Sequence, residues 1–137
     1  MTDIVYKVEN YLDPDEFIEV LNKSTLGERR PVNDFNRIKK MCENANLIVT
    51  ARLNGKLIGV ARSITDFAYC NYLSDLAVDK DYQKKGIGKR LIEETKMKTP
   101  LAKLILLSAP AAIDYYPKIG MKKHEHCFIL DDMNELK

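Results

Sequence analysis

Residues 76–89, LAVDKDYQKKGIGK, connect an apolar strand end to the start of a helix through a polar turn that contains Gly86 and Gly88. The first N–H groups of a helix lack intrahelical acceptors and lie at the positive end of the helix dipole. A glycine has no Cβ, so an anion can approach its backbone closely. The stretch is therefore typical of a site for a phosphate or pyrophosphate group.

The same turn carries side chains that add hydrogen-bond donors and positive charge: Gln83, Lys84, Lys85 and Lys89. It does not match the Walker A loop, GxxxxGK[ST], in either spacing or hydroxyl. It does not match the dinucleotide fingerprint GxGxxG either, because the third glycine is missing and three antiparallel strands are expected before it. The remaining alternative from this stretch alone is a tight turn with solvated lysines.

Two helices are expected near the amino terminus, after a short strand at residues 3–8. Asp13 and Pro14 form a helix start, with an N-cap side chain followed by proline at the first helical position. The expected buried face of this helix consists of Phe17, Val20 and Leu21. The second helix is expected over residues 31–43, and its apolar face consists of Phe35, Ile38 and Cys42.

Three adjacent antiparallel strands are expected between those helices and the glycine turn. The dipeptide Asn54-Gly55 suits a type I′ hairpin turn. The flanking residues 46–53 and 56–64 are rich in apolar and β-branched side chains, so we expect them to pair. A third strand is expected over residues 69–79.

The chain after the turn alternates helix and strand. A helix is expected over residues 86–98, ending before Pro100, and its inward face consists of Ile87, Leu91 and Ile92. Residues 103–108 predict a short buried strand, parallel to the strand before that helix. A short helix over residues 110–116 and a last strand over residues 125–130 complete the chain.

The resulting order is strand, two helices, three strands, helix, strand, helix, strand. This order predicts an α/β fold with a mixed, mostly antiparallel sheet flanked by helices. The length of 137 residues suits one core. We therefore expect a single domain over residues 1–137.

Composition narrows the class of protein. Hydrophobic residues make up 45% of the chain and charged residues 31%, as in ordinary globular proteins, and the net charge of +2 predicts no strong attraction to nucleic acid or membrane. No apolar run approaches the roughly 20 residues that span a bilayer. Cys42, Cys70 and Cys127 are far apart and odd in number, so we expect free thiols and a cytoplasmic location. His124, His126 and Cys127 offer too few ligands on one face for a metal site, and no metal is expected.

Two segments carry a resemblance to a known family. Residues 78–88 read V-x-x-x-Y-Q-x-x-G-x-G, which resembles the acyl-CoA-binding signature of the GNAT N-acetyltransferase superfamily. Residues 113–121, IDYYPKIGM, are similar to that family's FYxKLGF element and follow the next expected strand. The expected element order also matches, so the resemblance covers nearly the whole chain.

The resemblance implies acetyl-CoA as co-substrate and no metal. In this fold the pantetheine arm lies between two diverging strands, and the diphosphate lies on the glycine turn. The cofactor-binding residues that it implies are Leu76, Ala77, Val78, Gln83, Lys84, Lys85, Gly86, Ile87, Gly88 and Lys89. Ser108, at the end of the second diverging strand, either contacts the cofactor or simply ends the strand.

The resemblance also implies catalytic roles. Tyr116 aligns with the tyrosine that acts as general acid toward the thiolate in many members, with Tyr115 as its competitor and core packing as the alternative role. Asp75 is the candidate base that deprotonates the amine directly or through water; the alternative is a surface carboxylate that attracts a cationic acceptor. Strand alternation predicts that Asp75 lies on the face opposite Leu76 and Val78.

The expected activity is transfer of an acetyl group to a primary amine. The acceptor is open among polyamines, aminoglycosides, arylalkylamines, amino acids and protein amines. Glu28, Arg29 and Arg30 lie in a loop that often lines the acceptor pocket in this family, or form a solvated charged run. The competing hypotheses are a non-catalytic acyl-CoA-binding module and, less favoured, a nucleic-acid binder. A homodimer is expected by analogy alone.

Overall fold

The computed structural model describes residues 3–137, which form two compact units. The first unit extends to Leu107 and contains the whole sheet, whereas the second comprises Ser108–Lys137. None of the helices in the described part of the chain is long and apolar enough to cross a membrane. The single domain predicted over residues 1–137 stays a prediction.

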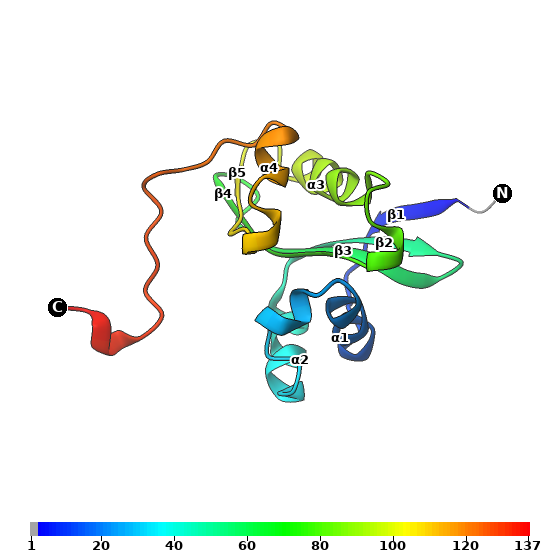
Figure 1. Ribbon diagram of the computed structural model, residues 1–137, viewed down its shortest axis with the longest axis horizontal. Coiled ribbons are helices and arrows are strands. Elements are labelled where there is room, and N and C mark those ends of the chain that lie inside the picture. The colour runs from blue at the N-terminus through cyan, green and yellow to red at the C-terminus, as the bar shows by residue number, and fades with distance from the viewer. Residues whose placement is uncertain (1–2) are drawn as a thin grey trace. The chain divides into compact units, whose positions relative to one another are not determined.

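The first unit is built on one five-stranded sheet in the order β1-β2-β3-β4-β5 (Figure 1). Its strands are β1 Ile4–Val8, β2 Leu47–Leu53, β3 Lys56–Thr65, β4 Cys70–Val78 and β5 Lys103–Ile105. Neighbouring strands pair antiparallel except β4 and β5, which are parallel. The predicted mixed, mostly antiparallel sheet is confirmed.

Helices cover both faces of this sheet (Figure 1). One face carries α1 Pro14–Lys23 and α2 Phe35–Asn44, and the other carries α3 Ile87–Lys98. The Asp13 side chain accepts a hydrogen bond from the N–H of Asp15 and caps α1. The predicted inner face of α1, with Phe17, Val20 and Leu21, is buried.

The start of the second helix was predicted four residues too early. A short 3-10 helix, η1 Leu26–Arg29, and a turn precede α2, which begins at Phe35. The Asp34 side chain accepts the N–H of Arg37, and this N-cap bond defines the start of the helix. Phe35, at the first helical position, is 47% exposed, whereas Ile38 and Cys42 are buried as predicted.

The hairpin between β2 and β3 is confirmed. Asn54 and Gly55 have φ angles of 51° and 82°, and two positive φ angles are what a type I′ turn requires. Past the turn, Gly59 lies beneath α3: a Cβ at this position would lie 3.2 Å from Ile87 Cγ2 and 3.2 Å from Leu91 Cδ1. The absence of a side chain at Gly59 lets α3 pack close to the sheet.

The second unit has little regular structure. It contains the short helices η3 Pro110–Ala112, α4 Tyr115–Lys118 and η4 Met133–Glu135, so the helix predicted over residues 110–116 is divided in two.

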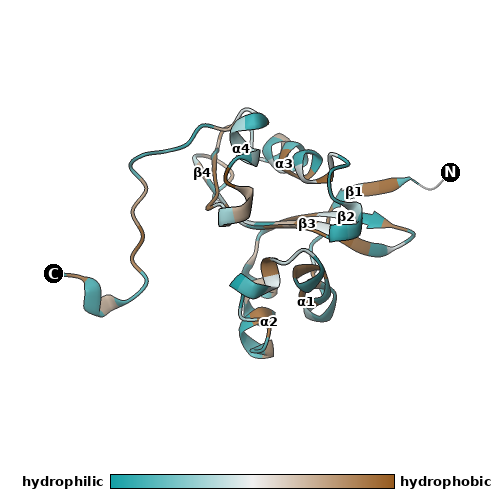
Figure 2. Cartoon of the chain, in the orientation of Figure 1, coloured by the Kyte–Doolittle hydropathy of each residue, from teal (hydrophilic) through white to brown (hydrophobic). Residues whose placement is uncertain are grey.

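The strand predicted over residues 125–130 is wrong: these residues form no ladder within the described chain. Their apolar side chains are exposed, and Phe128 is 92% exposed. Figure 2 shows hydrophobic positions, coloured brown, along this extended segment. A strand needs a neighbour to accept its backbone bonds, and the apolar sequence alone did not reveal whether one would be present.

Candidate active site

The outer edge of β4 is the first component of the site. β4 pairs with β5 only at Cys70, Asn71 and Tyr72, and then continues to Val78. Among residues 3–137, the edge facing away from β3 has no ladder partner beyond this point. Alternate N–H and C=O groups of residues 73–78 can therefore bind an extended ligand that carries amide groups.

The second component is the turn at the end of β4, which we call the anion loop, residues 79–89. Lys84 and Gly86 have φ angles of 64° and 80°, so the backbone turns twice before α3 begins. The first helical bond runs from the N–H of Arg90 to the carbonyl of Gly86. Within the described chain, the N–H groups of residues 84–89 have no protein acceptor. A run of free N–H groups at a helix start binds an anion.

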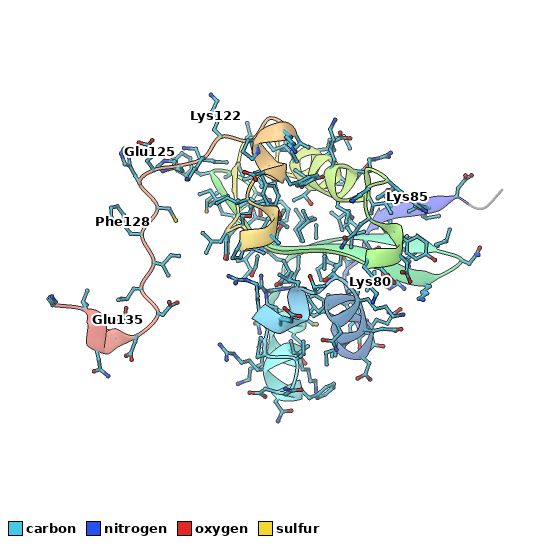
Figure 3. All side chains as sticks on the ribbon, in the orientation of Figure 1. Lys80, Lys85, Lys122, Glu125, Phe128 and Glu135 are labelled. Atoms are coloured by element: carbon cyan, nitrogen blue, oxygen red, sulfur yellow. The ribbon has the colours of Figure 1, made fainter. Side chains whose placement is uncertain are left out.

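Side-chain contacts hold the anion loop against the sheet. The Asp79 carboxylate accepts the N–H of Asp81 at 3.0 Å, and Gln83 Nε2 donates to the carbonyl of Val78 at 2.9 Å. Lys85 Nζ lies 5.6 Å from the centre of the Tyr82 ring. Lys85 and its neighbours on the loop project toward solvent (Figure 3). The loop thus combines a hydrogen-bonded backbone with exposed positive charge.

The structure brings most of the predicted cofactor-binding residues together. Leu76 and Val78 pack against the core beneath α3, whereas Ala77 belongs to the core beneath α1 and α2, so their backbones, not their side chains, are available to a ligand. The Ile87 side chain is 2% exposed, and only its N–H can contact an anion. Gly88 and Lys89 contribute N–H groups to the same helix start.

Asp75 lies beside a β-bulge in β4. The register passes from the pair Arg62–Asp75 to the pair Ser63–Leu73, which leaves Ser74 as the extra residue. The Asp75 side chain faces away from Leu76 and Val78, as predicted.

The Asp75 carboxylate is 0% exposed and forms ion pairs with two arginines. One oxygen accepts a hydrogen bond from Nε of Arg30 and the other accepts one from Nε of Arg62. A base that deprotonates an amine directly must contact it. The geometry therefore does not favour direct contact, and a base role through water stays a prediction.

The two arginines also bind the bulge residue, Ser74. Arg30 Nη2 donates to the carbonyl of Ser74 at 2.8 Å, and Arg62 Nη2 donates to the Ser74 hydroxyl at 3.0 Å. Arg62 Nη1 donates to the carbonyl of Met41 in α2 at 3.0 Å. The sequence did not predict this cluster, because Arg30 and Asp75 are 45 positions apart. One signal was present: a charged residue, Arg62, in an otherwise apolar strand requires a buried partner.

Tyr116 and Ser108 belong to the second unit. The rings of Tyr115 and Tyr116 pack edge to face with centroids 5.3 Å apart. Burial raises the pKa of Tyr116, and neighbouring Tyr115 raises it further, so the phenol keeps its proton at neutral pH. Ser108 lies beyond β5, which ends at Ile105, and its hydroxyl donates to the carbonyl of Ala109 at 2.7 Å.

Comparisons with known proteins identify the family of this chain. The sequence model of the acetyltransferase (GNAT) domain matches residues 16–132. Glucosamine 6-phosphate N-acetyltransferase 1 of Dictyostelium discoideum is 28% identical over 129 residues, which cover 82% of each chain. The chloroplastic GCN5-related N-acetyltransferase 2 of Arabidopsis thaliana is 31% identical over 70 residues, 49% of this chain but only 27% of that protein.

Solved structures show the same fold. A GNAT-family acetyltransferase from Streptococcus pneumoniae superposes with a TM-score of 0.76 and 16% identity, over 95% of this chain and 100% of that one. The chain belongs to the GNAT acetyltransferase family. It is an acyl-CoA-dependent acetyltransferase domain by class.

Proposed function

We propose that this protein transfers an acetyl group from acetyl-CoA to a primary amine, by direct attack of the amine on the thioester. The observation that carries the proposal is the open edge of β4 ending at a loop whose N–H groups have no acceptor among the described residues. The open edge of β4 can pair with amide groups, and the anion loop can bind phosphates. These are the two features that an extended pantetheine diphosphate requires.

The dimensions of the site support this placement. The diphosphate lies on the N–H groups of residues 84–89, and the pantetheine amides pair with the backbone of Leu76, Ala77 and Val78. From Val78 to Leu73 the strand spans roughly 17 Å, at about 3.3 Å per residue. An extended arm along this edge brings the thioester to the bulge at Ser74, where β4 and β5 separate.

The chemistry needs three events. The neutral amine forms a bond to the thioester carbon, a backbone N–H on β4 stabilises the oxyanion, and the C–S bond breaks with proton transfer to the thiolate. The phenol of Tyr116 is the proposed donor, because it lies in the segment that resembles the family's FYxKLGF element and, like an ordinary tyrosine, is protonated at neutral pH. The ammonium proton of the acceptor leaves before attack, through water to Asp75 or directly to solvent. After attack the nitrogen loses a second proton through water, and an equal proton returns to the Tyr116 phenolate, so that amide, thiol and phenol are all neutral at the end.

The acceptor that we favour is a small primary amine. The Dictyostelium relative, which covers 82% of this chain, is named for glucosamine 6-phosphate, an amino sugar ester. The loop after η1 contacts the β4 bulge through the bond from Arg30 to the Ser74 carbonyl, so this loop is the proposed source of specificity. A non-catalytic acyl-CoA-binding module is the alternative, although no contact among the described residues favours it.

Release of free thiol from acetyl-CoA with a panel of primary amines tests the proposal. We expect amine-dependent thiol release, together with a product whose mass is increased by one acetyl group. Reactions without amine give the background rate. Binding of CoA without thiol release for any amine would instead support the non-catalytic module.

A further inference from the structure

The cluster at the β4 bulge carries an unbalanced charge. Two guanidinium groups, those of Arg30 and Arg62, share the single carboxylate of Asp75. No other carboxylate in the described chain forms an ion pair with either arginine. The cluster therefore has a net charge of +1 in a mostly buried place, where an uncompensated charge is unfavourable.

The two arginines differ in what remains available to a ligand. The Arg62 side chain is 5% exposed, and all three of its nitrogen atoms donate within the protein. The Arg30 side chain is 21% exposed, and its three nitrogen atoms donate to Asp75, to the carbonyl of Arg29 and to the carbonyl of Ser74. A guanidinium has five N–H groups, so each arginine has two beyond these bonds. Only those of Arg30 belong to a side chain that solvent, and therefore a ligand, can reach.

The position of Arg30 places these two N–H groups at the reacting end of the site. Its bond to the Ser74 carbonyl anchors it at the bulge, next to the point where β4 leaves β5. In the proposed function, the thioester of acetyl-CoA lies at this bulge. The adjoining loop residues Glu28 and Arg29 are exposed and cancel in charge, so Arg30 determines the local sign.

We propose that Arg30 recognises an anionic group, a phosphate ester or a carboxylate, on the amine acceptor. The planar guanidinium matches the oxygens of both groups and can bind them with two parallel hydrogen bonds. The same excess of positive charge disfavours polycationic acceptors such as aminoglycosides and polyamines. This inference rests on the proposed function and specifies its substrate class.

Matched pairs of amines that differ only in the anionic group test this proposal. The pairs are glucosamine with glucosamine 6-phosphate, and ethanolamine with phosphoethanolamine; tyramine with tyrosine tests a carboxylate, and kanamycin serves as the polycation. The quantity measured is the ratio of kcat/KM for the anionic amine to that for its neutral partner. In the unchanged protein we expect a ratio of at least about 10 for one pair, as charged hydrogen bonds give.

Arg30→Gln should reduce that ratio to about 1–3, and Arg29→Gln, a change of equal charge on the neighbouring exposed residue, should leave it near the original value. The ratio compares two substrates of one variant, so a loss of folded protein cancels. Arg30→Lys keeps the charge without the planar fork and should give an intermediate ratio.

A ratio near 1 in the unchanged protein, a preference for kanamycin, or an equal loss in both glutamine variants would overturn the inference. Absence of turnover with every anionic amine would also overturn it. The proposed function would survive that result if a neutral or cationic amine released thiol, and it would fail if no amine did.

Discussion

The phenol of Tyr116 has a raised pKa because the side chain is partly buried and because Tyr115 lies beside it. A general acid must be protonated, so the alkaline fall in kcat should lie above the ordinary tyrosine value of about 10. Tyr116→Phe should lower kcat by roughly 100-fold and remove this alkaline limb, with little change in the Kd for CoA. Steady-state rates across pH and titration with CoA check both parts. Tyr115→Phe is the control, and a larger loss in that variant would assign the acid to Tyr115.

For single residues, the sequence predicted the face of a strand on which a side chain lies better than it predicted the residues that the side chain contacts. Strand alternation placed Asp75 on the correct face, because the period of a strand is local. Its bonds to Arg30 and Arg62 depend on which loop crosses which strand, and no local pattern carries that information. The structure therefore adds two arginine partners to Asp75, and its predicted role as a base, directly or through water, stays a prediction.

At the scale of elements, the contact between α3 and β3 positions the anion loop. A methyl group at Gly59 would meet Ile87 and Leu91 at 3.2 Å, so α3 or the strand would have to shift. Gly59→Ala should lower the free energy of unfolding by about 1–3 kcal/mol, the usual cost of overpacking. It should also weaken CoA binding, because Ile87 begins the helix. Thermal denaturation and CoA titration test this. An unaltered Tm with unaltered affinity would show that the close contact at Gly59 does not position α3.

The turn between β3 and β4 depends on one carboxylate. Asp66 accepts the N–H groups of Ala68, Tyr69 and Cys70 at 2.9, 2.8 and 3.0 Å. The hydrogen bond from Tyr69 contributes most, and together these bonds lower the pKa of Asp66 well below its ordinary value. A lowered folded pKa gives stability that is complete above the unfolded value of about 3.9 and is lost as the pH falls through the folded pKa.

Asp66→Asn should therefore lower the Tm at pH 7, and the difference from the unchanged protein should shrink in strong acid. Thermal denaturation of both proteins at pH 7 and at strongly acidic pH measures this. A Tm difference of the same size at both pH values would contradict the assigned role of the Asp66 charge.

Among the elements, those defined by local chemistry were predictable. The hairpin at Asn54-Gly55 and the cap at Asp13 follow from turn and capping preferences. The start of α2 was misjudged because the prediction began at Pro31, whereas the side chain that caps the helix belongs to Asp34. The strand over residues 125–130 failed because a strand depends on a partner elsewhere in the fold.

At the scale of the whole molecule, the first unit holds the paired sheet, while residues 122–131 form almost no backbone hydrogen bonds within the described chain. Backbone amides without partners exchange freely with solvent. We expect amides of residues 122–131 to exchange at nearly unfolded rates, whereas those of β2 and β3 are strongly protected. Hydrogen exchange read by mass spectrometry tests this. Protection of that segment would show that it pairs, within this chain or with a second copy.

Calorimetric titration with CoA tests most directly whether the free N–H groups of residues 84–89 bind a diphosphate. Gly86 and Gly55 have φ angles of 80° and 82°, and a Cβ at either position would meet only open space, so alanine imposes a similar strain of about 1–2 kcal/mol at each. Only Gly86 lies in the anion loop. We predict that the unchanged protein and Gly55→Ala bind CoA alike, and that Gly86→Ala binds it at least about 10-fold more weakly, a loss of about 1.4 kcal/mol. No binding by the unchanged folded protein, or equal binding by both variants, would contradict the assignment.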